Sequence, residues 1–162
     1  MAINLEYGQV GEMREWALGI ISSRQPDFTI EDGDKTPYMD RWFAVPRNPA
    51  GGVYIHRILR SDKDVPHDHP WDFTSYILHG GYYEERPGIP TEWYGTGSII
   101  HRKAADAHRL ILPDGEIAIS VCFLGPWQRD WGFHCPKGWV GWKYFCDGED
   151  KGRVGRGCGE MA

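Results

Sequence analysis

The chain has 162 residues, enough for one domain with a sizeable core, and its 41% hydrophobic and 25% charged residues are typical of a folded globular protein. A net charge of −5 disfavours nucleic acid as a partner, because that binding draws its affinity from clustered Lys and Arg. No apolar run approaches the roughly 20 residues that span a membrane, and the N-terminal region lacks the layout of a signal peptide, so we expect a single domain located in the cytoplasm. Four cysteines without a short regular spacing predict neither a disulfide framework nor a zinc ribbon.

The first predicted element is a helix over residues 5–23, where apolar side chains recur at a roughly helical spacing with Glu and Arg between them. Such an amphipathic helix fits the outside of a barrel, and the binding of a partner protein is the alternative. Residues 24–37 are rich in Asp, Gly and Pro and predict a loop.

Two strands follow over residues 38–45 and 52–59, and a turn-rich connection joins them into a hairpin. Alternation along the second strand sets Arg57 on one face and Arg60 on the other, so either face carries a guanidinium inward. A buried Arg needs an anionic partner. Arg57 is therefore a candidate for binding a substrate carboxylate, and an internal salt bridge to Asp or Glu is the alternative.

Short apolar segments separated by Gly and Pro turns continue to residue 124. With a single long helix, this pattern favours an antiparallel sandwich or barrel, which we place over residues 38–145. The predicted strands of this region beyond the first hairpin cover residues 73–78, 82–85, 98–102, 108–112 and 116–124.

The segment from Val65 to Gly81, VPHDHPWDFTSYILHGG, contains two histidines one residue apart. In an extended chain His67 and His69 point to the same side, while Asp68 points to the other. Neutral imidazole is a good ligand for Fe, Zn, Ni, Cu and Mn. The pair therefore forms half of a candidate metal site, and a third ligand must come from elsewhere.

This segment resembles the first motif of the cupin superfamily, Gly-x5-His-x-His-x3–4-Glu-x6-Gly. His67 and His69 match the two histidines, and Gly80 matches the closing glycine. Ser61 replaces the opening glycine, and Phe73 replaces the glutamate.

The second cupin motif, Gly-x5-Pro-x-Gly-x2-His-x3-Asn, falls on residues 97–112. Gly97 and His108 match it, whereas three other positions depart from it: Lys103, Ala105 and Leu112. The resemblance covers these two motifs only. It implies an all-β fold, a cupin-type antiparallel β-barrel or jelly roll with the N-terminal helix outside, and a divalent metal ion bound by His67, His69 and His108.

A set of three histidines without the glutamate is similar to the site of the thiol dioxygenases, cupins that bind Fe(II) through three histidines. The resemblance implies Fe(II) as the ion, with Zn, Ni or Mn as alternatives, and a dioxygenase that acts on a small molecule. The animal enzymes of that group have a crosslinked Cys where this chain has Phe73, so that feature is absent. Asp72 is a possible fourth ligand, and stabilisation of a turn is its alternative role.

Two other functions stay open. A metal-assisted isomerase, epimerase or lyase would need a general base such as His101, Glu84 or Tyr82, and a non-catalytic binding or structural module would need none. Candidate substrate-binding residues besides Arg57 are His101 and Trp71.

Residues 125–145 contain half of the eight Trp residues of the chain. They predict either an aromatic lid over the barrel or a contact between the subunits of a homodimer. Residues 147–162 are rich in Gly and charged residues and predict a loose tail.

Overall fold

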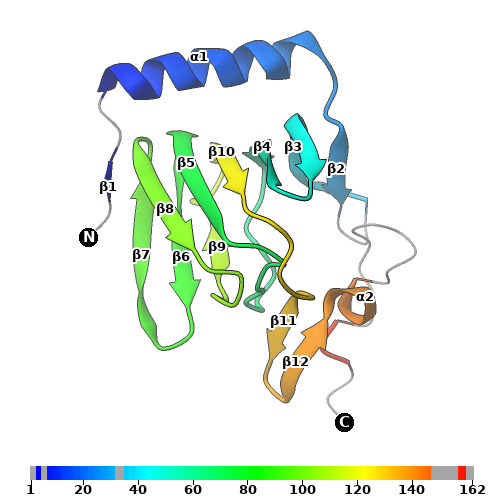
Figure 1. The fold of residues 1–162 in the computed structure, drawn as a ribbon. Helices are drawn as coiled ribbons and strands as arrows, with labels where there is room; N and C mark the ends of the chain where they lie inside the picture. Colours follow the sequence, from blue (N-terminus) through cyan, green and yellow to red (C-terminus); the bar gives the residue numbers. More distant parts are fainter. Residues whose placement is uncertain (1–2, 5–6, 32–34, 147–156, 160–162) are drawn as a thin grey trace.

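Antiparallel strands are the main secondary structure of the computed structural model, which describes residues 3–4, 7–31, 35–146 and 157–159. Within these residues a seven-stranded sheet faces a three-stranded sheet (Figure 1). The larger sheet has the order β1 (Ile3–Asn4), β8 (Ser98–Arg102), β5 (Phe73–His79), β10 (Ala118–Leu124), β4 (Gly51–Ile58), β3 (Pro37–Asn48) and β2 (Phe28–Glu31). The smaller sheet has the order β7 (Ile89–Gly95), β6 (Gly81–Arg86) and β9 (Arg109–Ile111).

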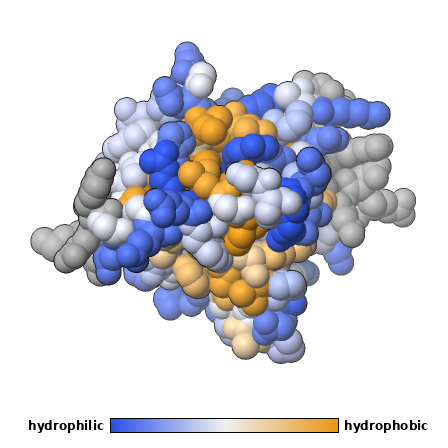
Figure 2. Space-filling view, turned by 90° about the horizontal axis from the view of Figure 1, so that it is seen from above, coloured by the Kyte–Doolittle hydropathy of each residue, from blue (hydrophilic) through white to orange (hydrophobic). Residues whose placement is uncertain are grey.

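Helix α1 (Tyr7–Ser23) runs over the upper ends of the strands in the view of Figure 1, and its side chains pack on the outer face of the larger sheet. Ala17 of the helix is fully buried in a cluster with Trp42, Ile55 and Val121 of the sheet. Seen from this side, hydrophobic residues form a band through the centre of the face that reaches its lower edge in the view, with hydrophilic residues on either side (Figure 2). The predicted helix outside the barrel is therefore confirmed, and residues 5–6 of its expected range lie outside the described residues.

The opposite face of the same strands points into the space between the two sheets. Its core joins Met39 and Ile77 of the larger sheet to Tyr82 and Leu110 of the smaller one. Alternation along each strand produces this division, since Ile55 packs toward the helix and its neighbours Tyr54 and His56 line the interior. Central strands with both faces covered read as nearly continuous apolar runs, as β10 does.

The turn between β5 and β6 depends on Gly80. Its φ is +63°, and a Cβ at this position would lie 2.0 Å from the carbonyl oxygen of Ile117. A larger residue would therefore clash with the backbone as well as adopt a left-handed conformation. The glycine that matches the closing residue of the first motif is fixed by the geometry of this turn.

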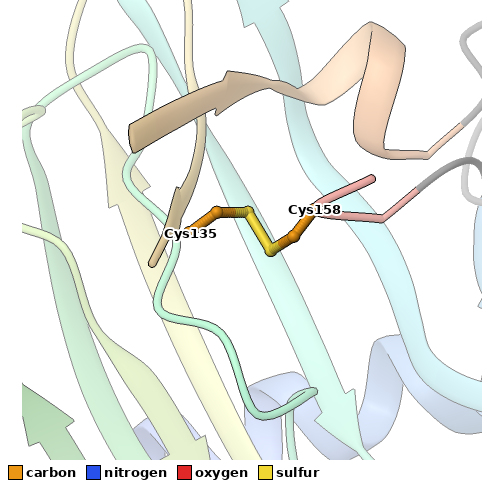
Figure 3. Close-up of a disulfide and its surroundings, with 2 residues drawn as sticks. All are labelled: Cys135 and Cys158. Carbon is orange, nitrogen blue, oxygen red and sulfur yellow. A yellow bond between two sulfur atoms is a disulfide. The ribbon is translucent and has the colours of Figure 1, made fainter. Parts of the chain in front are cut away.

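A second, small sheet pairs β11 (Gly132–Cys135) with β12 (Gly138–Gly141) and leads into α2 (Trp142–Phe145). Cys135 forms a disulfide with Cys158, and the two side chains meet between β11 and the C-terminal segment (Figure 3). The spacing of the cysteines predicted no disulfide framework, and it gave no indication of this one bond. Their 23-residue separation fits no motif, because the chain brings them together only by folding back.

The antiparallel β-barrel is confirmed, and the first hairpin, formed by β3 and β4, spans residues 37–58. Of the tail expected to be loose, residues 147–156 and 160–162 lie outside the described residues, while Cys158 is bonded to Cys135. No helix among the described residues is long and apolar enough to cross a membrane.

Candidate metal centre

The extended segment between β4 and β5 carries His67 and His69, and it is held on both sides by backbone hydrogen bonds. On one side His67 and His108 exchange two N–H···O bonds, at 2.8 and 2.9 Å. On the other side Asp68 N donates to Gly132 O at 2.9 Å, and His134 N donates to Pro66 O at 2.8 Å. The segment therefore acts as a short strand between the start of β9 and β11, which brings the two motifs together.

The three motif histidines meet at one point inside the barrel. One ligand nitrogen from each of His67, His69 and His108 lies within 4.8 Å of the other two. The Nε2 atoms of His69 and His108 are 2.9 Å apart, and the ring of His67 lies 4.9 Å from each of the other rings. The structure thus gathers the ligand set that the sequence suggested.

Glu84 of β6 orients His108 from behind. Its Oε1 lies 2.6 Å from His108 Nδ1, which directs the Nε2 of this histidine toward the other two. Arg102 donates to both oxygens of the same carboxylate, from Nε to Oε1 at 3.0 Å and from Nη2 to Oε2. Burial would raise the pKa of Glu84, but the hydrogen bonds from His108 and Arg102 outweigh it and lower the pKa to about 2. The carboxylate is therefore ionised and holds the imidazole in place.

Asp62 occupies the equivalent place behind His67. Its Oδ2 lies 3.7 Å from His67 Nδ1 and accepts the backbone N–H of Leu110 at 2.7 Å. The hydroxyl of Tyr38 donates to Oδ1. Burial raises the pKa of Asp62 to about 6. Two buried carboxylates thus lie behind two of the three histidines, an arrangement found around metal-bound imidazoles.

Burial also favours the neutral form of two of the histidines, His67 and His69. It lowers the pKa of His67 and of His69 well below the ordinary value of 6.5, and the nearby charge of His108 acts in the same direction. A neutral imidazole has a free lone pair for a metal. The donor atoms, their convergence and the carboxylates behind them all fit a divalent transition-metal ion.

No carboxylate joins the three histidines at the position where the first cupin motif has its glutamate. The ring of Phe73 packs edge-on to His69 at 4.8 Å and lies 5.9 Å from the ring of His108. The Asp72 carboxylate is engaged outside the cluster, because it accepts hydrogen bonds from the backbone N–H of Ala104 at 2.8 Å and from the Lys103 ammonium at 2.9 Å. Asp72 therefore stabilises the loop beside the site and is not among the clustered ligands.

Comparison with known proteins identifies the fold. The sequence matches no protein-family model and no curated protein. The structure is similar to the DMSP lyase DddQ from Ruegeria pomeroyi DSS-3, with a TM-score of 0.62 at 14% identity over 83% of this chain and 73% of that one. It is also similar to a cupin-2 domain from Rhodospirillum rubrum, with a TM-score of 0.53 at 12% identity over 62% of this chain and 68% of that one. The chain has the cupin fold.

A third likeness is to the polyketide cyclase RemF from Streptomyces resistomycificus, with a TM-score of 0.53 at 17% identity over 68% of this chain and 78% of that one. At these identities the likenesses concern the fold alone. The activity of this protein must be argued from its own site.

The histidines lie in the wall of a cavity of about 590 Å³ inside the cupin barrel. Most of its lining is aromatic or aliphatic, including Phe43, Tyr54 and Trp131. A volume of this size suits a small molecule.

The aromatic segment contributes to the wall of this cavity, as the lid interpretation predicted. Trp131, Phe133, Trp142 and Phe145 all line it. The rings of Phe133 and Phe145 stack, as do those of Trp131 and Trp142, so the hairpin and α2 form one aromatic layer.

The predicted substrate-binding residues lie in three different places. Trp71 lines the cavity, with the guanidinium of Arg47 4.6 Å from the centre of its ring. Arg57 points to the helix side of the sheet, where Asp40 accepts from its Nη2 at 2.6 Å. His101 accompanies Thr74 in a separate surface pocket, with 2.8 Å between Thr74 Oγ1 and His101 Nδ1. Arg57 therefore forms the internal salt bridge that was its alternative role.

Two cavity residues were not selected from the sequence. Arg41 of β3 and His56 of β4 are cross-strand neighbours, and both line the cavity. Arg41 lies on the same face of its strand as Met39 and Phe43, which are also lining residues. Alternation along residues 38–45 contains this signal, but only the pairing with β4 shows which face is inside.

Proposed function

We propose that this cupin is a mononuclear metalloenzyme that transforms a small molecule in the barrel cavity. The observation that carries the proposal is the convergence of three histidine nitrogens within 4.8 Å in the wall of a 590 Å³ cavity. When bound, a divalent ion would supply Lewis-acid activation and open coordination positions for substrate, water or O2.

The reaction type that the site favours is dioxygenation with Fe(II). Three neutral ligands and Phe73 in place of a carboxylate support this choice, since they preserve the ligand set of the three-histidine cupins. The chain's own residues have definite tasks. Glu84 and Asp62 orient the imidazoles, and the aromatic layer of residues 131–145 limits the access of water to the bound substrate.

A metal-assisted lyase or isomerase is the second candidate, and a specific feature favours it. Tyr38 and Tyr82 line the cavity, and the Tyr38 hydroxyl donates to the Asp62 carboxylate. Such a pair can relay a proton to or from a substrate held at the histidines. This reaction would proceed without O2.

Metal analysis tests the proposal. Wild-type protein purified without chelator should contain about one divalent ion per chain, and His67→Ala, His69→Ala and His108→Ala should each lose most of it, because a site of three ligands has no replacement. His79→Ala is the matched control, since this histidine contacts Arg14 and lies outside the cluster. Equal metal content in all five proteins would contradict the proposal.

An oxygen electrode separates the two reaction types. Fe(II)-loaded protein should consume O2 only in the presence of a substrate if it is a dioxygenase. Turnover of the same compound under argon would instead identify the lyase or isomerase reaction. Absence of turnover by a fully loaded site across a broad panel of small acids, alcohols and thiols would favour a non-catalytic binding module.

We propose further that the partner is a small molecule rather than nucleic acid, and that the chain forms a homodimer. The exposed rings of Tyr83 and Trp93, 4.9 Å apart on the β6–β7 hairpin, offer an apolar surface for such a contact, and light scattering would measure it. We also propose that the protein is located in the cytoplasm, although one structural feature opposes this location. The Cys135–Cys158 disulfide argues against it, because structural disulfides are rare in that compartment.

A further inference from the structure

Two cross-strand pairs of polar side chains lie next to each other on β3 and β4 but face opposite sides of the sheet. Asp40 is paired with Arg57 in the ladder, and Arg41 is paired with His56. The first pair points toward α1, and Asp40 accepts from Arg57 Nε at 3.0 Å and from Nη2 at 2.6 Å. The second pair points into the cavity. Alternation thus separates the acidic residue from the arginine that faces the interior.

Arg41 has no carboxylate partner among the residues that the structure describes. Its Nε donates to His56 Nε2 at 3.1 Å, its Nη2 lies 3.9 Å from Met39 Sδ, and its guanidinium lies 5.3 Å from the centre of the Tyr54 ring. Most other described arginines do have an acidic partner, namely Arg24, Arg57, Arg86, Arg102, Arg109 and Arg129.

A guanidinium in this position needs an anion. Arg stays charged at any physiological pH, and a cation removed from water is costly unless it is paired. Burial lowers the pKa of Arg41 from its ordinary value, which reflects this cost. The donors that His56 and Met39 do not use remain for a group that enters the cavity.

We propose that Arg41 and His56 form a subsite for the carboxylate of the substrate, whose other end binds at the three histidines. The inference rests on the proposed function, because it places the two ends of one small molecule in the same cavity. His56 accepts from Arg41 on Nε2, which leaves the proton of the neutral ring on Nδ1 as a further donor. The planar fork of Arg matches the two oxygens of a carboxylate.

The subsite and the metal centre share neighbouring side chains in the wall of one cavity, which favours a short molecule. Phe73 touches His69, and it packs with Tyr54 and Cys122 in one cluster beside Arg41. About one aromatic side chain therefore separates the two ends. The substrate class is a small carboxylic acid with an oxygen, nitrogen or sulfur donor a few bonds from the carboxylate.

A pair of hydroxamates tests the subsite. Succinic monohydroxamic acid carries a metal-binding group and a carboxylate, whereas butyrohydroxamic acid has a methyl group in place of the carboxylate. Co(II)-loaded wild-type protein, titrated by visible absorption, should bind the charged probe at least about tenfold more tightly, because charge-assisted hydrogen bonds add affinity. Arg41→Gln should remove this preference and keep both the metal content and the affinity for butyrohydroxamic acid. Arg57→Gln, the matched arginine on the helix side, should keep the preference.

The outcomes are distinct. Equal affinity for the two probes in wild type, or an undiminished preference in Arg41→Gln, overturns the subsite. If Arg41→Gln does not fold, Arg41→Lys and the wild-type comparison of the two probes decide the question. If no metal binds, thermal unfolding with millimolar butyrate still separates the two proposals. Stabilisation of wild type but not of Arg41→Gln then supports the subsite while the proposed function fails, and no stabilisation of wild type refutes the subsite.

Discussion

Replacing Asp68 by asparagine should loosen the aromatic hairpin from the metal-binding segment. The Asp68 side chain is buried and points away from the histidines that flank it. Its Oδ1 accepts from Gly132 N at 2.8 Å. Its Oδ2 accepts from His134 Nε2 and Trp139 Nε1, both at 3.0 Å, and pairs with Arg129 Nη1 at 2.7 Å. One carboxylate thus joins the β11–β12 region to the strand that carries two ligands.

The size of the effect follows from these contacts. Asparagine keeps one acceptor oxygen and turns an NH2 group toward donors that need an acceptor. A hydrogen bond to a charged group contributes about 1.5–3 kcal/mol, but the contacts at Oδ2 share one atom and are not additive. Arg129 is also partly exposed, which reduces its share. We expect a loss of about 3–5 kcal/mol in the free energy of unfolding, as for removal of one partner from a buried pair.

Urea unfolding of the chelator-treated protein, followed by far-UV circular dichroism and tryptophan fluorescence, measures this loss. Asp72→Asn is the matched control, because it removes a more exposed carboxylate on the same segment. A loss below about 1 kcal/mol for Asp68→Asn would refute the reasoning, since it would mean that the hairpin is held by its apolar contacts alone.

Three other predictions follow from the site. Glu84→Gln should lower metal affinity about 10–100-fold in a chelator competition titration, because it weakens the group that orients His108. Glu85→Gln is the control and should leave the affinity unchanged. Unchanged affinity in Glu84→Gln would show that the orientation of the His108 ring does not depend on the carboxylate. Asp72→Asn should retain the metal and lower the stability only slightly, and loss of most bound metal with the fold intact would show that Asp72 is a ligand. Metal-free protein should lose stability as the pH falls below about 6.5, since burial lowers the pKa of three histidines and the unfolded chain takes up protons that the native state cannot. The slope should be at most about 1.4 kcal/mol per pH unit for each histidine, and an unfolding midpoint independent of pH between 7.5 and 5.5 would contradict the assignment to His56, His67 and His69.

The sequence predicted those parts of the site that depend on local pattern. Alternation set His67 and His69 on one side of an extended segment, and a motif in the expected order supplied His108. Gly80 was recognisable because its turn tolerates no side chain. Each of these sequence patterns lies within a few residues of the side chain whose role it predicts.

Other parts depended on pairings between distant strands. Glu84 reaches His108 because β6 lies beside β9, a contact across 24 positions that no spacing rule contains. Alternation predicted an arginine on each face of the strand with Arg57, but β4 ends at Ile58, before Arg60. The guanidinium that lines the cavity comes instead from Arg41 of β3. Sequence patterns therefore predicted the ligands, whereas the groups that orient them and line the cavity required the sheet register.

The disulfide between Cys135 and Cys158 has a consequence for the covalent connectivity of the chain. It closes a loop that includes β12 and α2, and thus part of the aromatic wall of the cavity. Closure of a loop of this length removes conformational freedom from the unfolded chain worth about 3 kcal/mol. A protease that cuts once inside the loop would not release the wall, because the two fragments would stay linked until a reductant separated them.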